Sequence, residues 1–301
     1  MNSLVQIGSD YPQADVKQIF DVLDVTKATR QDYQARIGLF LVFIRDSGLD
    51  RNSFLNFKRM LAERNDLSVS TKNKYLAVAR IFLKELNRQG ILPADITQNV
   101  KAFKQSKKHK KDGVTDEEMA VIAQSLHNLA PSLEATRIKA IISLLALQGL
   151  RQIEVVRLNV TDLQLSRGVA FVQGKGRDDT EPIYLHPQTI RALREYIATH
   201  RIADGALFTS NSNNSRNRRI STRSVRQIVQ DYLASVGVDR TVHGFRHYFT
   251  TRLIKIYKSD LTEVARYTRH RSLETLQTYN DAISLQADLP RFHGAFSEVK
   301  I

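Results

Sequence analysis

The stretch from His243 to Tyr279, HGFRHYFTTRLIKIYKSDLTEVARYTRHRSLETLQTY, decides how this 301-residue sequence is interpreted. It holds a His-x-x-Arg-His cluster, a further histidine at His270, and a tyrosine nine residues after that histidine. Cationic and imidazole groups around one phenol are what phosphate-ester chemistry needs when no metal takes part. The same stretch also fits an ordinary basic helical surface, so its interpretation depends on the rest of the chain.

Composition points to an anionic partner. Lysine and arginine outnumber aspartate and glutamate by 45 to 31, which gives a net charge of +14. Such a surplus indicates nucleic acid most simply, although a ribosome-associated or merely basic protein also fits. The absence of cysteine excludes disulfides, thiolate metal sites and a cysteine nucleophile, and it fits a cytoplasmic, nucleoid-associated location. No apolar run approaches the ~18 residues of a membrane span, so we expect no membrane partner.

The first hundred residues predict a compact helical bundle. Apolar residues at helical spacing predict helices over residues 28–47 and 54–64, and a third that is capped by Ser70. Hydroxyl and ammonium groups in the first turn of a helix suit a DNA phosphate, although a solvated charged cap is the plain alternative. The predicted DNA contacts here are Thr71, Lys72 and Lys74.

A basic linker is predicted at residues 101–113. Residues 101–111, KAFKQSKKHKK, carry six lysines and no acid, and Asp112 and Gly113 follow. Such a segment would lie along a DNA backbone or serve as a flexible solvated tether, and the two functions are compatible. The predicted DNA contacts in it are Lys107, Lys108 and Lys110.

Residues 114–301 predict a second, α-rich domain with a small β-hairpin. The hairpin joins Val169–Val172 to Glu181–Leu185 through GKGRDDT. The expected helices begin at a capping box at Thr115 and include 136–147, 152–158, 187–200, one from Ser221 or Thr222 to about Ser235, 243–257, 261–267 and 272–279. Leu207-Phe208 is a candidate short strand. Basic residues predicted to contact DNA are Arg177 at the hairpin tip, Arg216, Arg218 and Arg219 in a polar loop, and Arg223 and Arg226 on the next helix.

Six candidate catalytic residues lie far apart in this sequence: Arg151, Lys175, His243, Arg246, His270 and Tyr279. Each also has a purely structural interpretation, such as a helix-end charge, a turn lysine, a helix cap or a half-buried tyrosine. Their order and their neighbours favour a catalytic interpretation over a structural one. The chain resembles the tyrosine recombinase, or phage integrase, family in four segments taken together: ALQGLRQIEVVRL, GKGR, HGFRHYF and RHRSLETLQTY.

The resemblance rests on four boxes and covers nearly the whole chain. Gly149-Leu150-Arg151 with Glu154 is similar to the first box, Gly174-Lys175-Gly176 to the hairpin lysine, His243, Arg246 and His247 to the second box, and His270 with Tyr279 to the third. STKNKYLAVARIFLKEL and KKHKK are similar to the family's DNA-facing helix and interdomain linker. Three positions depart from the pattern: Gln148 replaces a threonine, Thr268-Arg269 replaces Leu-Gly, and Val100 replaces a proline.

The resemblance implies the residue roles. Arg151 and Arg246 would bind the non-bridging phosphate oxygens, which the fork geometry of a guanidinium suits. Tyr279 would be the nucleophile, His243 would help to remove its proton, and Lys175 would protonate the departing 5′ oxygen. His270 would bind the phosphate, while Glu154 and His247 would support these groups. The expected product is a 3′-phosphotyrosine, formed without metal, cofactor or ATP.

The resemblance also implies partners and alternatives. We expect a two-domain clamp with a helical SAM-like core-binding domain (residues 1–100), duplex DNA carrying inverted repeats, and a homotetramer that passes through a Holliday junction and exchanges its tails, residues 281–301. The chain looks closest to Xer-like or resolvase-like members without an arm-binding domain. A second recombinase or a DNA-bending accessory protein stays open as a partner. The alternative functions are type IB topoisomerase-like relaxation of DNA and a non-catalytic DNA-binding relative.

Overall fold

The chain forms two compact units, residues 1–107 and 108–301, so the division falls inside the predicted basic linker. Both units are mainly helical and the second carries one small sheet, which confirms the predicted fold class. The computed structural model describes residues 18–105, 113–174, 179–210, 218–270 and 272–294. Among these residues, no helix is long and apolar enough to cross a membrane.

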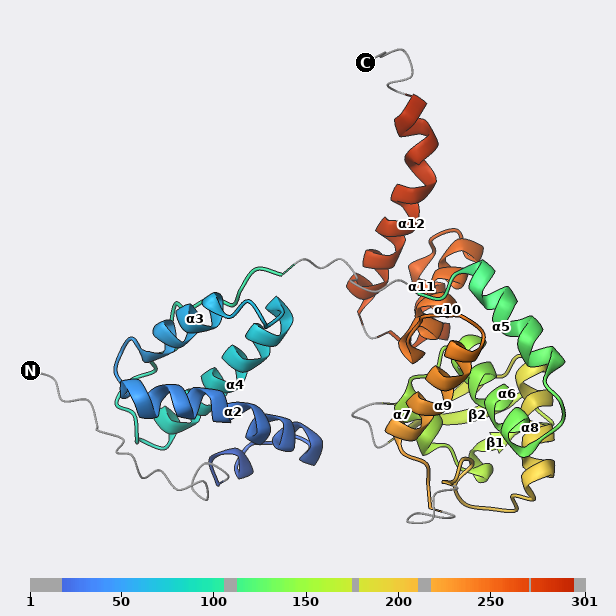
Figure 1. Ribbon diagram of the computed structural model, residues 1–301, viewed down its shortest axis with the longest axis horizontal. Helices are drawn as coiled ribbons and strands as arrows, with labels where there is room; N and C mark the ends of the chain where they lie inside the picture. The colour runs from blue at the N-terminus through green and yellow to red at the C-terminus, as the bar shows by residue number, and fades with distance from the viewer. Residues whose placement is uncertain (1–17, 106–112, 175–178, 211–217, 271, 295–301) are drawn as a thin grey trace, which may run out of the picture. The chain divides into compact units, whose positions relative to one another are not determined.

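The first unit is built on α2 (Lys27–Ser47), α3 (Ser53–Glu63) and α4 (Val69–Arg88) (Figure 1). These are the three helices that the apolar spacing predicts. Their apolar faces meet in an aromatic core, in which the rings of Phe40 and Phe57 pack edge to face with centroids 4.9 Å apart.

The start of α4 differs from the prediction. Ser68, not Ser70, caps the helix, because its hydroxyl accepts the Thr71 backbone N–H at 3.2 Å and Val69 is already helical. Both serines suit a cap by type, so sequence alone does not separate them. The correction leaves Thr71 in the first turn, with its hydroxyl 2.9 Å from that of Ser68. Lys72 donates to the Ala62 carbonyl at 2.9 Å, so its ammonium group already has a partner within the unit.

The first unit extends beyond the predicted boundary at residue 100. The Asn73 side chain donates to the Phe103 carbonyl at 3.0 Å and accepts the Phe103 N–H at 2.8 Å. These two bonds hold the chain against α4, so the linker begins later than residue 101. The predicted DNA contacts Lys107, Lys108 and Lys110 lie outside the described residues.

The second unit is arranged around α6, whose residues are buried on most sides. Figure 1 shows the neighbouring helices around it. The predicted capping box at Thr115 is confirmed, since its hydroxyl accepts the Glu118 N–H and the Glu118 carboxylate accepts the Thr115 N–H. The helices of this part are α5 (Asp116–Asn128), α6 (Leu133–Ala146), α7 (Gln152–Arg157), the 3-10 turn η1 (Val160–Asp162), α8 (Pro187–His200) and α9 (Thr222–Ser235), which Ser221 caps.

The predicted hairpin is present within a three-stranded antiparallel sheet of order β1-β2-β3. Strand β2 (Val169–Gln173) pairs with β3 (Thr180–Tyr184), and β1 (Leu163–Gln164) is an additional short strand. The candidate strand at Leu207-Phe208 was wrong. Leu207 donates its N–H to the Leu158 carbonyl, whereas the Phe208 carbonyl accepts the Ile220 N–H, so the two residues pair with different segments and only single bridges form, at residues 206 and 209.

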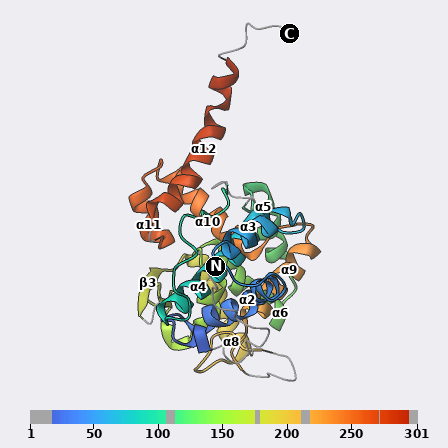
Figure 2. The same cartoon turned by 90° about the vertical axis from the view of Figure 1, so that its left-hand side faces the viewer.

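Three helices complete the second unit: α10 (Val242–Ile256), α11 (Leu261–Thr268) and α12 (Leu273–Gly294). The prediction that the last helix ends near Tyr279 was wrong. No glycine or proline follows Tyr279 until Pro290, so the helix continues through the residues expected to form a tail. Figures 1 and 2 show this second half of α12 extending beyond α11.

Candidate active site

Gly149 sets the turn that brings α6 to α7. Its φ of +59° lies in the left-handed region, and a Cβ at this position would come within 2.3 Å of the Phe249 ring on α10. Glycine is therefore required here for both backbone and steric reasons. The Gly149 carbonyl accepts a hydrogen bond from the Arg246 guanidinium, so the turn also orients a candidate catalytic group.

Glu154 is a buried carboxylate shared by two arginines. It accepts the backbone N–H of Arg151 at 2.8 Å and the Arg151 Nη1 at 2.8 Å, and Arg269 Nη2 donates to it at 2.8 Å. Burial alone would raise the pKa of Glu154, but the charges of Arg269 and Arg151 and the backbone hydrogen bond outweigh it and lower the pKa. The carboxylate stays ionised and fixes the guanidinium of Arg151.

Arg246 lies almost fully buried on α10. Its guanidinium donates to the carbonyls of Gly149 and Thr268, which orient it without cancelling its charge. Burial, followed by the charges of Arg151 and Arg269, lowers the pKa of Arg246 to about 9, so the group remains a cation at neutral pH. A buried cation with neutral partners favours an anionic ligand.

The Tyr279 hydroxyl points at the imidazole of His247. The ring of Tyr279 packs with Ile254, Val264 and other apolar residues of α10–α12, and its hydroxyl lies 3.4 Å from His247 Nε2. The His243 ring in turn meets the His247 ring edge to face at 4.8 Å between centroids. Burial raises the pKa of Tyr279 to about 12, although the Arg246 charge acts in the opposite direction. At neutral pH the phenol is therefore protonated.

His270 is held in one tautomer by a short chain of hydrogen bonds. Its Nδ1 lies 2.7 Å from the Thr268 hydroxyl, which itself donates to the Val264 carbonyl at 2.9 Å. Because that hydroxyl has one hydrogen, His270 Nδ1 must be the donor, and a neutral ring then leaves Nε2 as an acceptor. Burial, with the nearby cations Arg246 and Arg151 next in importance, lowers the pKa of His270 to about 3.

The structure places seven of the eight predicted catalytic and supporting residues in one cluster. The eighth, Lys175, lies outside the described residues, as do Arg177 and Arg216. The adjoining Gly174 carbonyl accepts Arg157 Nη1 at 2.9 Å, which ties the end of β2 to α7. The clustered residues are Arg151, Glu154, His243, Arg246, His247, His270 and Tyr279, and the roles assigned to them stay predictions.

Most predicted DNA-contacting residues that the structure describes lie at the surface. Lys74, Arg218, Arg223 and Arg226 are exposed, and their contacts with DNA stay predictions. Arg219 has a structural function, since its Nη1 donates to the carbonyls of Val156 in α7 and Leu158 just after it, at 2.7 and 3.1 Å. Its guanidinium is thus engaged in joining the loop before α9 to α7.

Sequence reasoning missed the part played by Arg269. The sequence marks it only as a departure from the family pattern, at a position where glycine is usual. The structure shows its side chain pairing with Glu154 and, at 3.3 Å from Nε, with Glu181 of β3. The only sign in the sequence was an arginine at a position where glycine is usual. Its partners could not be predicted, because they lie in α7 and β3, far away in the sequence.

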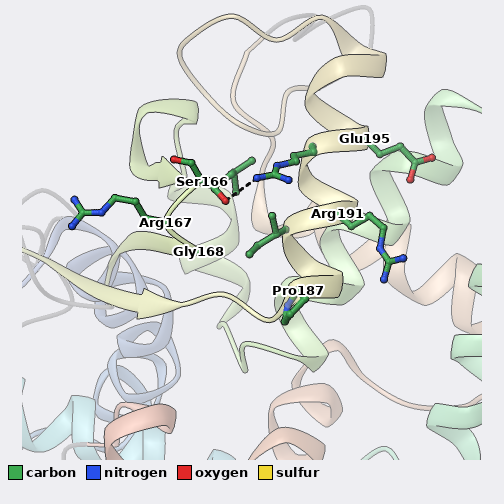
Figure 3. Close-up of a pocket in the computed structure, with 9 residues that line it drawn as sticks. Ser166, Arg167, Gly168, Pro187, Arg191 and Glu195 are labelled. Carbon is green, nitrogen blue, oxygen red and sulfur yellow. Dashed lines mark hydrogen bonds between the residues drawn. The ribbon is translucent and has the colours of Figure 1, made fainter.

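A separate cavity of about 880 Å³ lies between the β1–β2 turn and α8 (Figure 3). Arg167, Arg191 and Arg194 line it together with Gly168 and Pro187, and none of the clustered catalytic candidates does. Arg194 donates to the Leu165 carbonyl at 3.1 Å across this space. Among the residues that the structure describes, no group of three or more His, Asp or Glu side chains could hold a metal ion.

Two arginines, three histidines and a tyrosine lie together beside a small sheet, in the arrangement that the sequence resemblance predicts for a tyrosine recombinase. A model of the phage integrase family matches residues 114–284, which is more than half of the chain. The chain therefore belongs to the phage integrase family, and it is a site-specific tyrosine recombinase.

Individual relatives agree with this family. The chain is 28% identical to tyrosine recombinase XerC of Lactobacillus delbrueckii subsp. bulgaricus over 236 residues, which cover 75% of this chain and 77% of the relative. It is 29% identical to XerC of Thermodesulfovibrio yellowstonii over 226 residues, or 70% and 71% of the two chains. Its fold is similar to XerH bound to a palindromic difH substrate, with a TM-score of 0.72, 18% identity and coverage of 96% and 85%. It also resembles a lambda integrase tetramer bound to a Holliday junction, with a TM-score of 0.67, 13% identity and coverage of 92% and 78%.

Proposed function

We propose that this recombinase cuts and rejoins duplex DNA with the Tyr279 hydroxyl as its nucleophile. The observation that carries the proposal is the approach of that hydroxyl to His247 Nε2, at 3.4 Å, within a cluster that also contains Arg151 and Arg246. A phenol beside a proton acceptor and two guanidiniums provides both the nucleophile and the charge stabilisation that phosphoryl transfer requires.

The first chemical step transfers the phosphoryl group to the enzyme. The Tyr279 oxygen forms a bond to phosphorus, the bond from phosphorus to the 5′ oxygen breaks, and a 3′-phosphotyrosine results. The phenol must lose its proton, since its pKa is about 12. The geometry favours His247 as the acceptor rather than His243, which meets the His247 ring and would assist from behind it.

The two arginines would stabilise the negative charge that develops on the non-bridging oxygens. Arg246 is oriented by two carbonyls and Arg151 by Glu154, so neither has to reorganise during the reaction. His270 would bind a phosphate oxygen through Nε2. Because Nδ1 already donates to Thr268, this requires a proton on Nε2, which the approach of the negatively charged phosphodiester favours.

The departing 5′ oxygen needs a proton, and the resemblance assigns its delivery to Lys175. A 5′-hydroxyl of another strand then attacks the phosphotyrosine, which restores a phosphodiester and returns the tyrosine. One ester replaces another at each step, so the bond energy is conserved and the sequence of steps needs neither ATP nor a metal.

The proposed partners are duplex DNA and further copies of this chain. One structural neighbour is bound to a palindromic substrate and another is a tetramer on a Holliday junction. We propose that this chain likewise acts on inverted repeats as a tetramer. The second half of α12, where Leu289 is exposed, would pack on a neighbouring subunit.

The test uses a pool of duplexes with randomised inverted repeats and a nick that lets the cleaved 5′ fragment diffuse away. We expect adducts that survive denaturation, link the protein to a 3′ phosphate and leave a 5′-hydroxyl that kinase can label. Adducts through a 5′ phosphate would contradict the proposed step. Relaxation of any supercoiled plasmid without an enriched sequence would favour the topoisomerase alternative instead.

A further inference from the structure

Arg269 occupies an unusual place in the backbone. It ends α11 with a φ of +56°, in the left-handed region that costs little only for glycine. It stands between Thr268, whose carbonyl orients Arg246, and His270. Arg201, the exposed C-cap of α8, has a similar φ of +52°, so what distinguishes Arg269 is where its side chain goes.

The Arg269 side chain joins two elements that come from elsewhere in the domain. It is only 6% exposed, and it pairs with Glu154 of α7 at 2.8 Å and with Glu181 of β3 at 3.3 Å. In the sequence, strand β3 follows the hairpin connection that contains Lys175. One guanidinium therefore contacts both the carboxylate that holds Arg151 and the strand that follows the hairpin lysine.

We propose that Arg269 is a positioning residue for strand cleavage, which holds Glu154 against Arg151 and fastens β3 to the end of α11. This inference rests on the proposed function and deepens it. Arg269 would make no contact with DNA itself. It would act through Glu154, which holds Arg151, so the loss of Arg269 would slow cleavage more than it weakens DNA binding.

The charge balance around Glu154 gives this inference a distinctive signature. The Glu154 carboxylate interacts electrostatically with three arginines: Arg151, Arg246 and Arg269. Arg269 is the largest of the favourable charges that lower the pKa of the carboxyl. Without Arg269 the carboxyl would take up a proton at a higher pH, and a protonated Glu154 would hold Arg151 less firmly. As the pH is lowered, the variant without Arg269 should therefore lose cleavage at a higher pH than the wild type does.

The experiment measures single-turnover cleavage against pH on a duplex enriched with the wild-type protein, together with the Kd for that duplex. Arg269→Gly relieves the backbone strain and removes both ion pairs, so we expect cleavage about 10- to 100-fold slower and a Kd changed less than about threefold. The acid limb of the pH–rate profile, which is the fall in cleavage rate at low pH, should move to higher pH. Arg269→Lys keeps the charge but not the fork, so the acid limb should return while the rate recovers only in part. Glu181→Gln should slow cleavage a few-fold and leave the acid limb in place.

Arg266→Gln is the matched control, because it removes an arginine of the same helix that pairs with Glu263 at the surface, where the Arg266 side chain is 72% exposed. A rate and acid limb of Arg269→Gly that coincide with those of Arg266→Gln would overturn the inference. If Arg269→Gly does not fold, Arg269→Lys and Glu181→Gln test the inference instead. Wild-type cleavage rates in both of these variants would overturn the inference. If the wild-type protein forms no adduct, the proposed function itself has failed.

Discussion

Replacing Gly149 by alanine tests the centre of the site through a single methyl group. The added Cβ would lie 2.3 Å from Cδ1 of Phe249 and within 3 Å of two further ring atoms. Contacts this short are sterically impossible, so either the half-buried ring or the backbone turn must move. Because the Gly149 carbonyl orients Arg246, a shift of this turn also displaces a candidate phosphate-binding group.

The cost has two parts that a control variant separates. An alanine in the left-handed region costs about 1–2 kcal/mol, and overpacking against the Phe249 ring adds about 1–3 kcal/mol. Gly237 has a φ of +73° in the same unit, and a methyl group added there would have nothing within 4 Å. Gly237→Ala should therefore lose about 1–2 kcal/mol of unfolding free energy, and Gly149→Ala about 2–5 kcal/mol.

Urea unfolding followed by circular dichroism gives both free energies, and covalent adduct formation gives the effect on the site. We expect Gly149→Ala to lose cleavage by about 100-fold, as a displaced reacting geometry implies, while Gly237→Ala retains it. Adding Phe249→Ala should recover part of the lost stability, with a coupling of about 1–3 kcal/mol. Equal destabilisation by the two glycine variants would refute the close contact with Phe249.

Three further predictions follow from the same contacts. Glu154→Gln leaves two arginines without their shared carboxylate, so the free energy of unfolding should fall by about 3–5 kcal/mol in urea titrations and adduct formation should drop with it. The pKa of His270 is depressed from 6.5 to about 3, so the unfolded chain binds a proton that the folded chain does not, and stability should fall as pH drops through this window; His270→Gln should show a smaller loss between pH 7 and pH 4. Arg219→Ala should destabilise the fold by about 1–3 kcal/mol, because it removes bonds to two carbonyls, whereas a residue that only contacts DNA would leave unfolding unchanged.

The sequence predicted those features that depend on local patterns. The capping box at Thr115, the helix from Pro187 to His200 and the β2–β3 hairpin each follow from residues that are neighbours in the chain. The boxes around Arg151 and Arg246 singled out residues that the structure brings together, since side-chain types in a fixed order carry that information without a structure.

Features that depend on distant partners could not be predicted. The pairing of Arg269 with Glu154 joins residues 115 positions apart, and the place of His247 nearest to Tyr279 depends on how α10 packs against α12. Tertiary packing decided each of these cases.

The central claim is that the Tyr279 hydroxyl attacks the DNA phosphate, and Tyr279→Phe tests it most directly, because it removes one oxygen and keeps the buried ring. On the enriched nicked duplex, we expect this variant to bind DNA with a Kd close to that of the wild type and to form no adduct that survives denaturation. The wild-type protein should form adducts in which the modified peptide contains Tyr279. Covalent complexes that persist in Tyr279→Phe would contradict the account.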